Sequence, residues 1–288
     1  MSVTVHDVGQ TAGARMVLVA ALALFAGTGC DNTIDPLDDV DGDQFAVQGY
    51  LDMEENVQRI RVEGLRSSIL GESVDLTGVV VTSRDHVTGE VIMWDRETVQ
   101  IDGDGTVDIY SAEFRPEPGH RYTLDVARPG RQGTVATTMV PPQPGLTVTE
   151  PVNLIQTVFL TDLPRSPDFM AMKYEVLVPE NNEFETVEIV YEQEGTSTVR
   201  NRLDVRLATD RFIVQGRLFR DDNDAPLTLA QVGLVVRLPS QEFERNAGSG
   251  NISNGEGFFG SVARFEYSWQ LSEQVVREIG YEDGQQGG

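Results

Sequence analysis

Between residues 45 and 142, short segments that alternate apolar and polar residues follow one another, with turn residues between them. Residues 120–126 show this most clearly, because every second side chain is apolar and would face the core from one side of an extended strand. The other candidate strands are 45–51, 57–63, 74–83 with a continuous apolar stretch at 79–81, 89–94, 99–101, 106–110 and 134–140. About seven short strands without a helical period predict an immunoglobulin-like β-sandwich.

The segment 57–63 departs from strict alternation in its spacing. In residues 57–63 the apolar side chains are Val57, Ile60 and Val62, which are not spaced by two throughout. A β-bulge adds one residue to a strand and shifts the alternation by one position. The spacing therefore predicts a bulge, or a strand that begins later than Val57.

Residues 141–145 read Pro-Pro-Gln-Pro-Gly, a run that cannot continue a paired strand. We therefore expect the immunoglobulin-like β-sandwich to cover 45–142 and a second β-rich, sandwich-like domain to cover 146–281. The strands expected in the second domain are 152–160, 172–178, 186–191, 203–207, 212–219 and 227–238. A short helix is expected at 240–245 with Ser240 as its N-cap. The fold class is all-β.

The C-terminal part of the chain contains two glycine-rich segments. In residues 251–262, three glycines surround two phenylalanines, which predicts a tight turn that brings an aromatic strand into the core. Residues 282–288 are glycine-rich and acidic, and we expect a disordered tail there.

The charge of the chain restricts its partners. Acidic residues outnumber basic ones by 46 to 22, and the formal net charge is −24. Such a surface repels nucleic acid, so we expect no nucleic-acid partner. Two interpretations remain open: adaptation to a saline habitat, or attraction of a cationic ligand.

An apolar run at residues 16–26 follows Arg15 and precedes the only cysteine of the chain, Cys30. The run is too short to span a bilayer as a helix and predicts a secretory signal peptide over 1–29. Two starts of translation are open, Met1 with a long polar lead or Met16. Gly27, Thr28 and Gly29 before Cys30 resemble the lipobox of bacterial lipoproteins, with glycine where that pattern favours leucine at position 27. The resemblance implies that the Cys30 thiol is acylated; the alternative is a plain signal peptide and an incidental cysteine.

Residues 30–44 follow the cysteine and include six aspartates between positions 31 and 43. A segment with so little apolar surface cannot bury enough of it to fold, so we expect an acidic flexible tether. Acidic residues at this place also resemble the surface-export signal of Bacteroidota lipoproteins. A solvated linker is the alternative.

Asp102, Asp104 and Asp108, around two glycines, form the one weak metal candidate. Hard cations such as Ca²⁺ favour several carboxylate oxygens on a tight turn. The spacing departs from the EF-hand template, however, and Asp-Gly is also a common hairpin turn. The two histidines after the leader, His86 and His120, lack partners at metal-ligand spacing and are expected to be surface or edge residues.

Taken in order, four parts of the chain resemble the Bacteroidota lipoprotein family catalogued as domain of unknown function 4249 (DUF4249). They are the lipobox-like leader, the opening strand Phe-Ala-Val-Gln-Gly-Tyr at 45–50, the hairpin Pro-Gly-His-Arg-Tyr-Thr-Leu at 118–124 with the Pro-Pro exit at 141–142, and the segment Asn-Ile-Ser-Asn-Gly-Glu-Gly-Phe-Phe-Gly at 251–260. The resemblance implies a lipid-anchored protein of the outer membrane, facing the periplasm or the cell surface. It also implies an association with a TonB-dependent transporter, and no active-site residues.

These observations lead to two expected functions. The first is a non-enzymatic accessory protein that captures a ligand or caps a transporter, and the second is a structural or adhesive surface module. A hydrolase is disfavoured because there is no Gly-x-Ser-x-Gly elbow and no Cys-His pair, and two histidines offer little material for general base catalysis. We expect no catalytic residues, metal or cofactor; the ligand-binding residues are unknown from the sequence.

Overall fold

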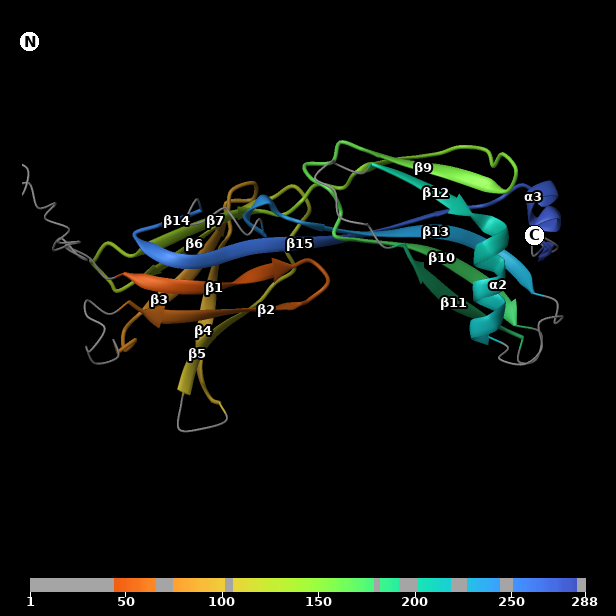
Figure 1. Cartoon of the computed structure of the whole chain (residues 1–288). Coiled ribbons are helices and arrows are strands. Elements are labelled where there is room, and N and C mark those ends of the chain that lie inside the picture. Colours follow the sequence, from red (N-terminus) through yellow and green to blue (C-terminus); the bar gives the residue numbers. More distant parts are fainter. Residues whose placement is uncertain are drawn as a thin grey trace, which may run out of the picture. The chain divides into compact units, whose positions relative to one another are not determined.

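The computed structural model describes residues 44–65, 75–101, 106–178, 182–191, 201–218, 227–243 and 251–283. Residues 1–40 and 41–288 are two separate units, and the fold described here belongs to the second. Within the described residues most elements are β-strands, with one long helix, α2 (Leu207–Leu218), and a short one, α3 (Glu273–Glu278) (Figure 1). The expected all-β class is confirmed. No helix in the described ranges is long and apolar enough to cross a membrane.

The N-terminal half is a two-layer sandwich that is joined by one strand. The order β1-β2-β5-β4 forms one layer, and β3-β6-β7 forms the other. Strand β4 belongs to both layers, since its first half pairs with β3 and its second half pairs with β5. The strands are β1 (Phe45–Asp52), β2 (Val57–Gly64), β3 (Val80–Asp85), β4 (Val91–Gln100), β5 (Thr106–Glu113), β6 (Arg121–Ala127) and β7 (Thr134–Met139). In sequence order this is the ABED/CFG arrangement of the immunoglobulin fold, which confirms the predicted sandwich.

A tyrosine at the start of β6 fixes the corner between the two layers. Tyr122 is 2% exposed, and its phenolic oxygen accepts a hydrogen bond of 3.1 Å from the backbone N–H of Glu117. A tyrosine that bonds back to the backbone before strand F is a hallmark of this fold. Its ring lies next to Phe114, which also packs edge-on against Trp94 of β4. These aromatic residues hold the interior of the sandwich together at its corner.

The long strand β15 (Gly255–Trp269) connects the sandwich to the rest of the chain. Its first half pairs in parallel with β1, and its second half pairs antiparallel with β13 (Thr228–Pro239). Figure 1 shows β15 running from the sandwich strands alongside β13. Phe259 on β15 is completely buried, as expected from the glycine-rich segment at 251–262.

The sheet continues beyond β13 into the second half. Its outer strands are β10 (Phe169–Val178) and β11 (Glu183–Val190), and a separate three-stranded sheet contains β8 (Gly145–Val148), β9 (Ile155–Thr161) and β12 (Arg202–Arg206). The remaining short elements are η1 (Gln241–Phe243), β14 (Ile252–Ser253) and β16 (Glu282–Asp283). The buried apolar residues of both halves form one contiguous cluster. The division into domains between 142 and 146 stays a prediction.

The strand predicted at 212–219 is wrong, because residues 207–218 form helix α2. Alternating apolar residues and the β-branched pair Ile213 and Val214 favour a strand locally. The side chains that are buried, however, follow helical spacing: Leu207, Asp210 and Val214 face the core, and Phe212 is 67% exposed. Packing of this face against the sheet overrides the local propensity.

The bulge predicted in residues 57–63 is also wrong. Strand β2 pairs with β1 and β5 in unbroken register. The inward positions are Gln58, Ile60 and Val62, so the alternation is regular and a glutamine occupies one buried place. The side chain of Gln58 accepts a hydrogen bond from the N–H of Asp52 at 2.8 Å and donates to the carbonyls of Asp52 and Glu55. These bonds offset the cost of burying an amide.

Two smaller expectations also need correction. The two strands expected at residues 89–94 and 99–101 are a single one, since β4 runs through both without a turn. Glu282 and Asp283 fall within the expected disordered tail, but they pair in parallel with β13 as β16.

Candidate ligand pocket

Most of the candidate site residues from the sequence lie outside the described ranges. These are Gly27, Thr28, Gly29 and Cys30 of the anchor and Asp102 and Asp104 of the metal candidate. Of the latter group only Asp108 is described. The structure therefore leaves both the anchor and the calcium site as predictions.

Asp108 lies on β5 and is engaged by other side chains. Its Oδ1 accepts hydrogen bonds from Arg96 Nε at 2.8 Å and Thr98 Oγ1 at 2.7 Å. Burial by itself would raise the pKa of Asp108, but these two bonds outweigh it and hold the pKa below its ordinary value. No group of three or more metal-ligating side chains occurs within the described part of the chain.

The two histidines have structural partners. His120 Nδ1 lies 2.9 Å from Asp85 Oδ2, and His86 Nε2 lies 2.7 Å from Thr123 Oγ1. Asp85 also accepts a hydrogen bond from the N–H of Val87, in the turn between β3 and β4. Both histidines therefore fasten the ends of sandwich strands.

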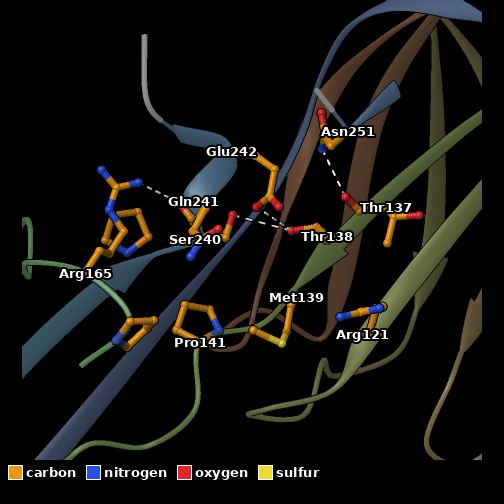
Figure 2. Close-up of a pocket in the computed structure, with 12 residues that line it drawn as sticks. Arg121, Thr137, Thr138, Met139, Pro141, Arg165, Ser240, Gln241, Glu242 and Asn251 are labelled. Carbon is orange, nitrogen blue, oxygen red and sulfur yellow. Dashed lines mark hydrogen bonds between the residues drawn. The ribbon is translucent and has the colours of Figure 1, made fainter. Parts of the chain in front are cut away.

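A cavity of about 300 Å³ lies where segments distant in the sequence meet (Figure 2). Strands β6 and β7 form one wall, and the end of β13 with η1 forms another. The loop before β10 and the start of the 251–260 segment complete it. Its lining residues are Arg121, Thr137, Thr138, Met139, Pro141, Pro164, Arg165, Pro239, Ser240, Gln241, Glu242 and Asn251.

Hydroxyl groups gather at the base of this cavity. Thr138 Oγ1 lies 3.1 Å from both Glu242 Oε2 and Ser261 Oγ. Ser261 Oγ in turn donates to the carbonyl of Met139 at 3.0 Å. Because each hydroxyl has only one hydrogen, and Ser261 donates its hydrogen to Met139, the single hydrogen of Thr138 is shared among Glu242, Ser261 and Ser240. The carboxylate of Glu242 is the strongest of these acceptors, because its hydrogen bond is charge-assisted. The carboxylate of Glu242 is thereby held in the wall of the cavity.

Ser240 connects the sandwich to β13. Its hydroxyl oxygen accepts a hydrogen bond from the N–H of Ser261 at 3.0 Å, and its carbonyl accepts one of 2.6 Å from Arg165 Nη1. A short helix does follow Ser240, as expected, but it is a 3₁₀ turn. The expected N-cap is not formed, since the hydroxyl bonds to Ser261 instead.

Two arginines lie on opposite sides of the cavity in Figure 2. Arg165 comes from the loop before β10, and the bond to Ser240 fixes its position. Arg121 begins β6 and pairs with Met139 of β7. Among the described lining residues Glu242 is the only acidic one and Arg121 and Arg165 are the basic ones, in a chain of net charge −24.

Sequence reasoning missed this pocket because its residues are separated by up to 130 positions. One signal was present in the strand at 134–140. Its inward positions include Thr134 and Thr138, and both are buried. A polar residue that points into a core requires a partner, so these threonines could have indicated a polar junction with another segment.

A second buried polar group lies under helix α2. Asp210 is 3% exposed, and its Oδ2 accepts hydrogen bonds from the phenols of Tyr174 at 2.5 Å and Tyr191 at 2.6 Å. Burial raises the pKa of Asp210, and the two phenol hydrogen bonds lower it by less. This group fastens α2 to the sheet.

The strand order and the tyrosine corner define the class: an immunoglobulin-like β-sandwich protein, an architecture that many cell-surface modules share. No protein-family model matches the chain, and no curated protein matches it either.

Solved structures of fibronectin type III and titin segments resemble the chain weakly. The FN1–FN3 domains of chicken CNTN1 are 10% identical, with a TM-score of 0.24, 77% of this chain covered and 64% of that one. A segment of two fibronectin type III domains from chicken tenascin is 13% identical, with a TM-score of 0.21 and coverage of 80% and 100%. A multidomain titin segment is 10% identical, with a TM-score of 0.21 and coverage of 79% and 66%.

Proposed function

We propose that this protein is a non-enzymatic ligand-capture module that is held at the outer membrane by a lipid on Cys30. The observation that carries the capture role is the cavity of about 300 Å³ beside β7 and η1. Its volume lies at the lower end of the range for small-molecule sites. Its wall combines proline and methionine surfaces with a few convergent polar groups, which is the usual composition of such sites.

The lining chemistry favours holding a ligand over transforming it. Activation of a serine or threonine hydroxyl requires a positioned general base and an orienting group behind it. Among the described lining residues no histidine or lysine accompanies Thr138 or Ser240. The hydroxyl of Ser261 is occupied by the carbonyl of Met139.

The anchor part of the proposal comes from the sequence. Two or three acyl chains on Cys30 would hold the protein to a bilayer with negligible release, since each buried methylene contributes about 0.8 kcal/mol. Following the resemblance to DUF4249, we include a TonB-dependent transporter as the proposed partner, to which the captured ligand would be passed.

The anchor is tested with Cys30→Ser in a bacterial host that acylates lipoproteins. We expect the chain with Cys30 to carry the palmitate label and to lie in the outer-membrane fraction. The Cys30→Ser variant should be unlabelled and lie in the soluble fraction. A chain with Cys30 intact that stays soluble and unlabelled would exclude the anchor.

The capture role is tested by a thermal-shift screen of the folded protein against small polar metabolites. Gln241 is exposed and lines the cavity, so Gln241→Trp should fill the space and abolish every hit. Gln274→Trp on α3 is the control, because Gln274 is exposed and does not line the cavity. Hits that survive Gln241→Trp, or a screen without hits, would favour the structural or adhesive module.

A further inference from the structure

We propose that the cavity selects an anionic ligand, namely a small hydroxylated molecule with a carboxylate or phosphate group that Arg121 and Arg165 bind. This inference rests on the proposed capture function and specifies the chemistry of its ligand. It follows from the partners of the two arginines, the place of Glu242 and the charge of the whole chain.

Arg121 has no counter-charge in the part of the chain that the structure describes. Among the residues that the structure describes, no carboxylate lies within ion-pair distance of its guanidinium and no acceptor takes a hydrogen bond from it. Other arginines in the same ranges do have carboxylate partners: Arg96 pairs with Asp108, and Arg237 pairs with Asp168. In a chain with 46 acidic and 22 basic residues, an arginine left unpaired at a cavity wall is available to a ligand.

The neighbours of Arg121 on the same face of the sheet add to its positive potential. Arg84 of β3 is exposed and lies opposite Thr123, two positions from Arg121 along β6. Residues two apart on a strand, and residues directly paired, share a face. Asp125 lies on this face as well, but it is four positions from Arg121 along β6.

Arg165 is oriented before any ligand arrives. The bond from its Nη1 to the carbonyl of Ser240 holds the guanidinium at the rim of the cavity. Guanidinium groups bind carboxylate and phosphate oxygens through paired, charge-assisted hydrogen bonds. A side chain that is already positioned loses less entropy on binding.

Glu242 sets the selectivity of the cavity. The hydrogen bond from Thr138 holds its carboxylate in the wall, where it opposes an anion. Gln241 is exposed and offers its amide to the hydroxyls of a ligand, and the three prolines offer apolar surface. The amide nitrogen of Asn251 already donates to the carbonyls of Thr137 and Phe259, so its amide oxygen is the group left to accept. Arg121, which has no carboxylate partner among the described residues, supplies the attraction for an anion, and Glu242 opposes a second negative charge on the ligand.

The test compares three probes that share one scaffold: D-glucose, D-glucuronate and D-glucose 6-phosphate, titrated calorimetrically into the folded protein. We expect at least one anionic probe to bind more tightly than glucose, and which of the two does so identifies carboxylate or phosphate. Arg121→Gln should lower the affinity for that probe by about tenfold or more, as expected for the loss of a charge-assisted hydrogen bond. Glu242→Gln should raise the affinity for the same probe roughly threefold, because it removes a negative charge that repels the anion.

Three controls accompany these variants. Arg121→Lys should keep part of the affinity, since the charge is retained. Arg59→Gln removes another arginine that has no ion-pair partner among the described residues and does not line the cavity, and it should change nothing. The thermal midpoints of all variants establish that they fold.

Equal affinity for glucose and both anions, or an anion whose affinity is unchanged in Arg121→Gln, would overturn the anionic assignment. Neutral hits in the metabolite screen that Gln241→Trp abolishes would also overturn it and leave the capture role standing. A screen without any hit would overturn both.

Discussion

Asp210 places a carboxylate among tyrosines, in surroundings that favour its neutral form. Because burial raises its pKa in the folded protein, the folded state binds this proton more readily than the unfolded state. The stability that comes from this group is complete below the unfolded pKa and is lost as pH rises through the folded pKa. The ionised carboxylate therefore opposes folding at neutral pH, although Tyr174 and Tyr191 still donate to it.

We expect Asp210→Asn to gain stability relative to the original chain as pH rises from 4 to 7, reaching about 1 kcal/mol or more at pH 7. The amide oxygen can still accept both phenol hydrogen bonds, and the cost of burying a charge disappears. Urea unfolding at several pH values measures the difference. A relative loss for the variant as pH rises would contradict the prediction.

Asp204 is a control whose pKa is shifted in the opposite direction to that of Asp210. Its hydrogen bond from Thr157 and its pair with Arg202 lower its pKa. A lowered pKa contributes stability above the unfolded pKa that is lost as pH falls through the folded one. Asp204→Asn should therefore lose stability relative to the original chain as pH rises from 2 to 6, by the same measurement.

The tyrosine corner gives a second prediction for a single side chain. Tyr122→Phe removes the acceptor for the N–H of Glu117 and should lower the free energy of unfolding by about 1 to 2 kcal/mol. Tyr110→Phe is the matched control, because its buried hydroxyl has no hydrogen-bond partner among the described residues. Its removal should cost nothing. Equal losses in the two variants would show that the corner bond is not what stabilises the fold.

Among the elements, β15 depends on a glycine where it pairs with β1. Gly257 has φ +109°, and a Cβ there would lie 2.0 Å from the carbonyl oxygen of Val47. Gly257→Ala should therefore disrupt the parallel pairing and lower the unfolding free energy by about 3 kcal/mol or more. Chemical unfolding followed by circular dichroism would measure the loss of stability. An unchanged unfolding midpoint would contradict the prediction.

Gly216 in helix α2 is the matched comparison for Gly257, because the same Gly→Ala substitution should have the opposite effect there. Its φ lies outside the left-handed region, and a Cβ at this position would meet no atom within 4 Å beyond the helix's own backbone. Gly216→Ala should stabilise the protein by about 0.5 to 1 kcal/mol, since alanine is the better helix former. The same substitution thus has opposite signs in a strand and in a helix of one protein.

Some elements of the fold can be predicted from the sequence and others cannot. Alternation in residues 120–126 and 134–140 is enough to predict β6 and β7, because one face of each strand is buried and the other is more accessible to solvent. It fails at α2, where only contacts with distant strands distinguish a helix from a strand. It also leaves the pocket unseen, because Arg121, Arg165 and Glu242 come together only through the pairing of β13 with β15.

For the whole molecule, the net charge of −24 predicts a strong response to salt. Self-repulsion of the carboxylates destabilises the folded chain, and salt at 1 M reduces the screening length to about 3 Å. We expect the urea midpoint to rise between dilute buffer and 1 M NaCl. A midpoint that does not rise would count against adaptation to a saline habitat and favour a ligand-directed role for the charge.

The parallel pairing of β1 with β15 determines how the fold would bear a pulling force. The segment leading to Cys30 enters at the N-terminal end of β1, and β15 leaves the ladder at its C-terminal end toward β13. Tension between a membrane anchor and a load on the second half would slide the two strands along each other. All hydrogen bonds of the ladder would then share the load at once instead of opening one after another. If Cys30 carries the proposed anchor, the β1–β15 ladder would therefore be a shear-resistant joint.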